Sequence, residues 1–321
     1  MSAASSASAS ASAPVFAGVV PPVATPLLED GSIDHPSLSR LVDRLVAEGV
    51  SGLFALGSTG ETAYFTDDQR VELLRTIVSA NAGRVPVIAG AIELTAPRII
   101  ETARRLVDAG AQAIVTTAPL YTLNSAAEVA DHFRTIAAAI EAPLWAYDVP
   151  VRVHSKLGID LLVQLGAEGV IHGVKDSSGD DVSFRRLIAA NDAAGRPLQL
   201  LTGHEVVVDA MALAGADGVV PGLANVEAAG YVRLWDAAKS GDWVTARAEQ
   251  ERINRLFDIV FQPKGLSGDA TGVGAFKAAM HARGIIDHAT MANTVQALDA
   301  DAVAGIRDIL DELHLLPVAV A

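Results

Sequence analysis

Eight short apolar runs, separated by stretches with a helical period, constrain the fold of this chain more than any other feature. Each run is rich in Val, Ile, Leu or Ala and is bounded by Gly, Pro or polar residues, as is typical of buried strands. The runs occupy residues 19–27, 52–57, 85–91, 113–119, 143–150, 171–178, 198–203 and 218–223. Such a regular alternation predicts parallel strands that are connected by helices.

An eightfold alternation favours a closed (β/α)8 TIM barrel over an open doubly wound sheet, which alternates in the same way. Residues suited to helix N-caps precede four of the helical stretches, namely Asp34, Thr66, Thr95 and Ser125. After residue 240 the strand pattern stops, and segments with a helical period follow one another. We therefore expect a catalytic barrel over residues 15–240 and a C-terminal helical extension over residues 241–321.

Composition excludes several classes of protein. The formal net charge is −14 and no Lys/Arg run offsets it, which argues against a nucleic-acid partner. No apolar stretch reaches the roughly 20 residues of a membrane helix. The chain has no cysteine and therefore no thiol nucleophile, and the absence of cysteine fits a cytoplasmic protein. The Ala/Ser-rich residues 1–14 lack the pattern of a signal peptide, and we expect them to be disordered.

Lys175 is the sharpest candidate for catalysis. It is one of only five lysines, and it stands where the sixth apolar run meets the polar turn of "GVKDSSGDD" (173–181). In a barrel this position lies at the mouth, where active sites form. An apolar surrounding disfavours the ammonium form, and a neutral amine can attack a carbonyl to form a Schiff base. A structural lysine paired with Asp176 or Asp180 is the alternative interpretation.

The end of the second run, "GSTGE" (57–61), is suited to an anionic ligand. Gly57 lets a ligand approach the backbone, and N–H groups together with the Ser58 and Thr59 hydroxyls can hold a carboxylate. An ordinary turn that caps the next helix is the alternative. A phosphate-binding loop is excluded, because no lysine follows in the required pattern.

Other strand ends supply further candidates. Tyr147 lies at the end of the fifth run and Tyr121 follows the fourth. A tyrosine hydroxyl can relay protons, although a packing role is equally compatible with the pattern. Arg152 is suited to a substrate carboxylate or to a surface ion pair. Glu205 follows the seventh run, and Val220 lies in the eighth. The histidines show no metal-ligand spacing, so we expect no catalytic metal.

Taken together, these motifs resemble the dihydrodipicolinate synthase/N-acetylneuraminate lyase family of Schiff-base aldolases. The similarity covers roughly residues 15–285. It is carried by "TP" (25–26), "GSTGE" (57–61), Pro-x-Tyr (119–121), "YDVP" (147–150), "GVKDSSGD" (173–180) and "GADGVVPGLANV" (215–226).

The resemblance implies a role for each matching residue. Lys175 would form the imine with pyruvate or another 2-keto acid, and Tyr147 would relay protons. Gly57, Ser58, Thr59 and the backbone around Val220 would hold the keto-acid carboxylate. Thr59 would contact Tyr121 across a subunit interface of a homotetramer, a dimer of dimers. No metal or organic cofactor is implied.

The second substrate is left open by the sequence. Arg152 matches the arginine with which the synthases hold an aldehyde's carboxylate, whereas Ser58 and Glu205 are closer to the sialate lyases and sugar-acid aldolases. Val206, at the second acidic position of the sialate lyases, argues against a long polyol. The candidates are a dihydrodipicolinate synthase and a 2-keto-3-deoxy sugar acid aldolase or dehydratase. A metal-dependent lyase and a non-catalytic keto-acid-binding barrel are rivals from other classes.

Overall fold

The computed structural model describes residues 16–317, and its eight strands form one parallel sheet. Neighbouring strands follow the order β1-β8-β7-β6-β5-β4-β3-β2. The two ends of this order meet, because Pro22 forms a parallel bridge with Phe54 of β2 and the Phe54 N–H donates to the Pro21 carbonyl at 3.0 Å. The prediction of a (β/α)8 barrel is confirmed. The expectation of disorder in residues 1–14 lies outside the described residues.

The strands are β1 (Gly18–Val19), β2 (Leu53–Ala55), β3 (Val87–Gly90), β4 (Ala113–Thr116), β5 (Leu144–Asp148), β6 (Gly173–Asp176), β7 (Gln199–Thr202) and β8 (Gly218–Val219). They coincide with the eight apolar runs, but the first and last are much shorter than the runs. Proline explains the difference, since it cannot donate to a strand ladder. Pro21 and Pro22 follow Val20, whose N–H makes the last bond from this segment to β8, while the bridge of Pro22 to β2 remains. Pro221 follows β8 in the same way.

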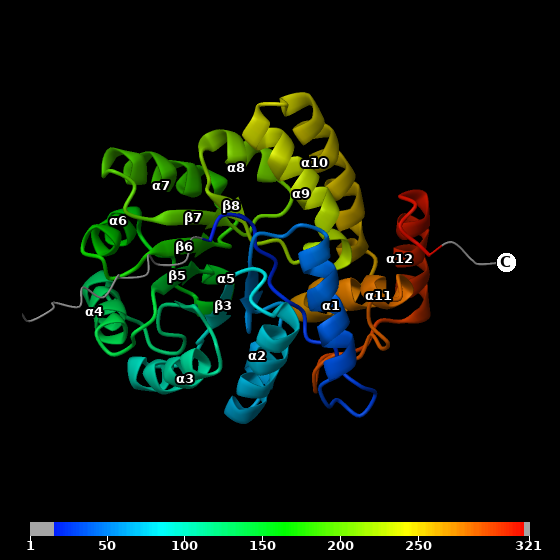
Figure 1. Ribbon diagram of the computed structural model, residues 1–321, viewed down its shortest axis with the longest axis horizontal. Helices are drawn as coiled ribbons and strands as arrows, with labels where there is room; N and C mark the ends of the chain where they lie inside the picture. The colour runs from blue at the N-terminus through cyan, green and yellow to red at the C-terminus, as the bar shows by residue number, and fades with distance from the viewer. Residues whose placement is uncertain (1–15, 318–321) are drawn as a thin grey trace, which may run out of the picture.

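Helices surround the strands, as Figure 1 shows. They are α1 (His35–Ala47), α2 (Asp67–Asn81), α3 (Ala96–Asp108), α4 (Ala126–Ala137), α5 (Pro150–Val153), α6 (Ile159–Ala167), α7 (Asp181–Ala193), α8 (Val208–Ala214) and α9 (Ala224–Ser240). A single 3₁₀ turn, η1 (Thr62–Tyr64), follows β2. In residues 16–317 no helix is both long enough and apolar enough to cross a bilayer.

Side-chain caps fix where several of these helices begin. The predicted N-caps Asp34, Thr66 and Ser125 each accept a hydrogen bond from a backbone N–H in the first turn of their helix. Thr66 and Ser125 also form reciprocal capping boxes with Gln69 and Glu128. Thr95 precedes α3 as predicted, but its side chain makes no capping bond.

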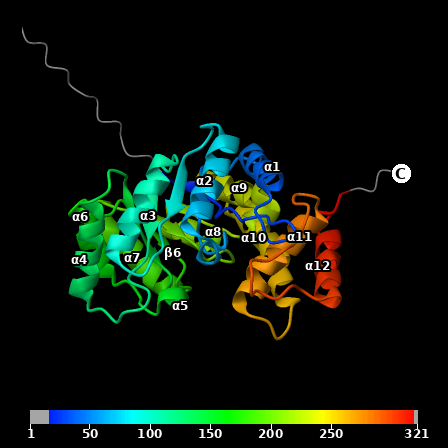
Figure 2. The same ribbon diagram turned by 90° about the horizontal axis from the view of Figure 1, so that it is seen from below.

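The C-terminal extension contains helices α10 (Trp243–Phe257), α11 (Ala275–Ala282) and α12 (Ala300–Glu312). A 3₁₀ turn, η2 (Asp258–Phe261), and a π-helical segment, η3 (Ala270–Gly274), connect α10 to α11. Figures 1 and 2 both place α11 and α12 at one end of the molecule, beside the barrel helices α1 and α9 rather than around the strands. The predicted helical extension is therefore confirmed.

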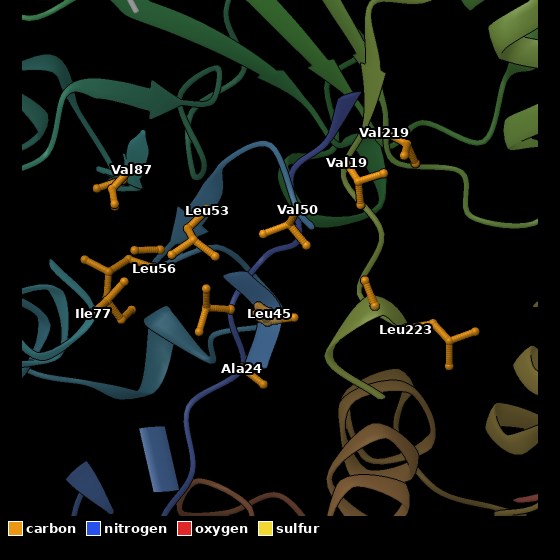
Figure 3. Close-up of a cluster of buried hydrophobic side chains, with 14 of the residues drawn as sticks. Val19, Ala24, Leu45, Val50, Leu53, Leu56, Ile77, Val87, Val219 and Leu223 are labelled. Carbon is orange, nitrogen blue, oxygen red and sulfur yellow. The ribbon is translucent and has the colours of Figure 1, made fainter. Parts of the chain in front are cut away.

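Two apolar layers hold the barrel together. The interior layer contains Phe16, Phe54, Ile88, Trp145 and Leu201, and the edge of the Phe16 ring packs on Trp145 with the ring centroids 5.6 Å apart. The outer layer lies between strands and helices, and Figure 3 shows part of it, including side chains from β1, β2, β3 and β8. The strands are thus buried on both faces, as their continuous apolar sequences indicated.

Barrel closure between β1 and β8 requires the absence of a side chain at Gly218. A Cβ at this position would lie 2.4 Å from the Gly18 carbonyl oxygen, a backbone atom that cannot move aside. We expect Gly218→Ala to lower the free energy of unfolding by about 2 kcal/mol or more, measured by urea denaturation. Gly158→Ala is the matched control, because a Cβ there meets nothing within 4 Å. Equal stability of the two variants would contradict this role for Gly218.

Candidate active site

The pairing of β5 with β6 places Tyr147 directly beside Lys175. Both side chains are buried in the barrel, with exposed fractions of 3% and 5%. The Lys175 Nζ lies 4.2 Å from the ring centroid of Tyr147 and 4.6 Å from that of Phe54. The structure therefore brings together the two residues that the sequence singled out for imine formation and proton relay.

The Tyr147 hydroxyl lies in a polar environment inside this apolar layer. Burial alone would raise the pKa of the phenol, but the Lys175 ammonium and hydrogen bonds with Ser58 and Ser177 outweigh it, and the pKa falls below its usual value near 10. A phenol with a lowered pKa gives up its proton more readily. This property suits Tyr147 to proton transfer with a neighbouring group.

The turn after β2 carries the residues suited to a carboxylate. Gly57 is required there, because a Cβ would lie 2.7 Å from the Phe54 ring. Among residues 16–317 neither the Ser58 nor the Thr59 N–H donates to a protein acceptor, which leaves both for a ligand. The Thr25 hydroxyl donates to the Gly60 carbonyl at 2.8 Å and so fixes the turn to the segment after β1.

A buried ion pair joins this turn to the C-terminal extension. Glu61 ends the "GSTGE" motif in the left-handed region, with φ of 55°, and its carboxylate pairs with Lys277 of α11. Its other oxygen accepts from the Ala292 N–H at 2.9 Å, and Lys277 donates to the Thr290 carbonyl at 2.8 Å. Both side chains are fully buried, so loss of either would leave an unpaired charge in the core.

A second ion cluster lies behind the two inward-facing residues. Asp148 and Asp176 follow Tyr147 and Lys175 in their strands, so their side chains point to the opposite face of the sheet. Lys156 pairs with both carboxylates. Burial raises the pKa of Asp148 despite this contact. The cluster joins the carboxyl ends of the two strands that carry the central residues of the site.

Arg152 lies at the entrance to the site, bound to a residue of the extension. Both of its terminal nitrogens donate to the two carboxylate oxygens of Asp269, and the Tyr64 hydroxyl donates to the same carboxylate at 3.0 Å. Hydrogen bonding to Asp269 is the main cause that raises the pKa of Arg152. Cavities of about 210 and 260 Å³ each contain Ser58, Arg152 and Asp269 in their walls.

Glu205 and Val220 form the wall on the side of β7 and β8. The Glu205 carboxylate accepts from the Leu223 N–H at 2.7 Å and from the Tyr231 hydroxyl at 3.3 Å. Burial raises the pKa of Glu205 to about 7. Val220 is buried, and its N–H donates to the Thr202 carbonyl at 2.7 Å, so this N–H is already satisfied within the sheet.

Tyr121 is set apart from the other site residues. It lies in the loop after β4 with 88% of its surface exposed, next to a cavity-lining residue, Leu120. The contact with Thr59 across a subunit interface stays a prediction. Within the described part of the chain, no three His, Cys, Asp or Glu side chains are grouped in a way that could hold a metal ion.

Comparison with known proteins places this geometry in a family. The sequence matches the profile of the dihydrodipicolinate synthetase family over residues 15–313. A 4-hydroxy-tetrahydrodipicolinate synthase from Phenylobacterium zucineum is 34% identical over 77% of this chain and 83% of its own length. The synthase of that name from Leptothrix cholodnii is 31% identical over 93% of this chain and 98% of its own length. The chain belongs to the dihydrodipicolinate synthetase family, whose members are aldolase-type lyases.

Solved structures agree with this assignment. The Escherichia coli prophage protein YagE, crystallised with pyruvate, superposes with a TM-score of 0.88 at 27% identity, covering 94% of this chain and 99% of YagE. The dihydrodipicolinate synthase from Acinetobacter baumannii, also crystallised with pyruvate, has a TM-score of 0.84 at 26% identity. The match covers 94% of this chain and 99% of that synthase. The similarity therefore extends through the C-terminal helices as well as the barrel.

Sequence reasoning did not single out four residues that shape the site, namely Thr25, Lys156, Asp269 and Lys277. Thr25 stood in a recognised motif without an assigned role. Lys156 and Lys277 were detectable in principle, because only five lysines occur, and Lys277 lies among apolar residues. Asp269 gave no signal, since it lies in a polar, glycine-rich stretch far from the barrel in sequence.

The raised pKa of Glu205 predicts how stability depends on pH. Because the folded-state pKa of about 7 exceeds the ordinary value of 4.5, the folded protein binds more protons than the unfolded chain between these values. Stability contributed by this group should therefore fall as pH rises from about 4.5 to 7. Urea denaturation across this range should show a steeper decline for the wild type than for Glu205→Gln. Parallel profiles would show that Glu205 has an ordinary pKa.

Proposed function

We propose that this protein is a class I aldolase-type lyase that forms a Schiff base between Lys175 and pyruvate or a related 2-keto acid. The observation that carries the proposal is the Lys175 amine, buried within 5 Å of the Tyr147 and Phe54 ring centroids at the carboxyl ends of the barrel strands. A lysine in such a position is available for attack on a carbonyl. The pyruvate complexes of two structural neighbours support the choice of ligand.

The carboxylate of the keto acid would bind to the turn after β2. The N–H groups of Ser58 and Thr59 lack protein acceptors in the described chain. The turn packs on the Phe54 ring, whose centroid lies 4.6 Å from the Lys175 Nζ, so a keto acid held here would have its carbonyl carbon within reach of the amine. The buried Glu61–Lys277 pair holds the turn against the extension and limits its movement.

The chemistry follows from these contacts. The amine of Lys175 adds to the keto carbon, and loss of water gives an imine whose protonated nitrogen withdraws electrons from the adjacent bond. Loss of a proton from the methyl carbon of pyruvate gives an enamine, which attacks an aldehyde to form a carbon–carbon bond. The reverse sequence cleaves that bond. Tyr147 supplies and removes the protons, because its ring centroid lies 4.2 Å from the Lys175 Nζ and the pKa of its phenol is lowered.

The family relationship supports an assembly of several subunits. Tyr121 and Leu123 are the two most exposed large apolar side chains of the described residues, at 88% and 97%, and they lie in one loop. A second subunit would cover this loop and bring its own Tyr121 toward Thr59, as the family resemblance implies. We therefore propose a homotetramer with Tyr121 and Thr59 in its proton relay, acting in the cytoplasm.

Trapping with borohydride tests the Schiff base. Incubation with pyruvate and sodium borohydride should add the mass of a reduced pyruvate adduct to the peptide containing Lys175. Lys175→Ala should abolish the adduct, whereas Lys239→Ala, which removes an exposed lysine of α9, should retain it. Tyr147→Phe should form the adduct and turn over about 10²-fold more slowly or worse. Absence of a wild-type adduct with pyruvate and with a panel of 2-keto acids would refute the proposal.

A further inference from the structure

The ion pair at the entrance consists of one cation and one carboxylate from distant parts of the chain. Arg152 belongs to α5, and Asp269 immediately precedes η3 of the extension, 117 residues later. Their contact is bidentate, the arrangement in which a guanidinium and a carboxylate match best. The Tyr64 hydroxyl donates to the same carboxylate at 3.0 Å. Asp269 therefore occupies the face of Arg152 that a substrate carboxylate would need.

The pair lies where the second substrate has to enter. Arg152, Asp269 and Ser58 belong to the walls of both cavities at the barrel mouth. The smaller cavity, of about 210 Å³, is completed mainly by apolar groups, including Ala63, Ile92 and Leu120. Ser58 follows Gly57, which packs against the Phe54 ring, and the centroid of that ring lies 4.6 Å from the Lys175 Nζ. A molecule in this cavity therefore lies next to the reacting end of the site.

Every charged group in the wall of the smaller cavity is paired with a group of opposite charge. Asp269 balances Arg152, and the buried Lys277 balances Glu61, which also lines the smaller cavity. The larger cavity contains Glu205 as a further carboxyl group. An anionic substrate group would therefore have to displace Asp269 from Arg152 and then lie close to its carboxylate. Displacement would leave the Asp269 carboxylate, whose side chain is only 19% exposed, without its cation and beside a second anion, which is unfavourable.

We propose that Asp269 determines specificity by neutralising Arg152, so that the aldehyde joined to the enamine is uncharged. Two of the five guanidinium N–H donors of Arg152 are used by Asp269, and the remainder can hydrogen-bond a hydroxyl or the aldehyde oxygen. The inference rests on the proposed function.

In the forward direction the enamine carbon bonds to the aldehyde carbon, and the aldehyde oxygen takes a proton. Water then hydrolyses the imine and restores the Lys175 amine.

The test compares two aldehydes in reaction with pyruvate, glyceraldehyde without charge and succinic semialdehyde with a carboxylate. For the wild type, kcat/KM should favour glyceraldehyde by about tenfold or more, because only the charged aldehyde must compete with Asp269. Asp269→Asn keeps the size of the side chain and frees the guanidinium. In this variant the ratio of the two kcat/KM values should shift toward succinic semialdehyde by about tenfold or more.

Two further variants separate specificity from folding. Adding Arg152→Met to Asp269→Asn should remove the gain with succinic semialdehyde, since the freed cation is gone. Asp258→Asn removes the same charge from another arginine pair of the extension, with Arg255, and should leave the ratio unchanged. A wild-type preference for succinic semialdehyde would overturn the inference, as would an equal loss of both activities in Asp269→Asn.

Borohydride trapping with pyruvate alone is carried out on the same samples. If the Lys175 adduct forms normally but the wild type does not favour glyceraldehyde over succinic semialdehyde in kcat/KM, the role of Asp269 is overturned. The proposal of a Schiff base at Lys175 then still stands. A missing wild-type adduct overturns the proposed function, and the inference about Asp269 with it.

Discussion

The register between β5 and β6 is the constraint on which the rest of the site depends. Tyr147 is paired with Lys175, and Asp148 with Asp176. Because side chains alternate along a strand, this register directs the first pair into the barrel and the second pair outward. The phenol and the amine meet inside, while Lys156 binds the two carboxylates on the other face. A shift of β6 by one residue would turn Lys175 to the face opposite Tyr147 and separate the two side chains.

The C-terminal extension contributes residues to the candidate active site as well as packing against the barrel. Lys277 of α11 reaches the turn that carries Ser58 and Thr59, through the buried carboxylate of Glu61. Asp269 reaches the entrance through Arg152. Both contacts are ionic and buried or half-buried, so their geometry is more tightly constrained than that of an apolar contact. The barrel supplies the reacting groups, and the extension fixes the surroundings in which they act.

Much of the barrel could be predicted from the sequence, because each strand is a local apolar run and three of the predicted N-caps bond to their own first turn. The length of the first strand could not be predicted in this way. An apolar pattern gives no information on backbone hydrogen bonds, and Pro21 and Pro22 have no N–H group to donate. The central pair was also accessible, because Lys175 and Tyr147 stand at strand ends. The Arg152–Asp269 contact was not, since its partners lie 117 residues apart and neither has a local pattern.

The sequence by itself determined the order of strands and helices, and with it the end of the barrel at which polar residues gather. Local propensity and the period of apolar residues suffice for this, because each element is specified by its own neighbours. Tertiary structure alone decided which charges neutralise one another. Arg152 was equally suited by sequence to a substrate carboxylate or to an ion pair, and the fold brought Asp269 to it. Electrostatic pairing depends on distance in space, which residue order does not encode locally.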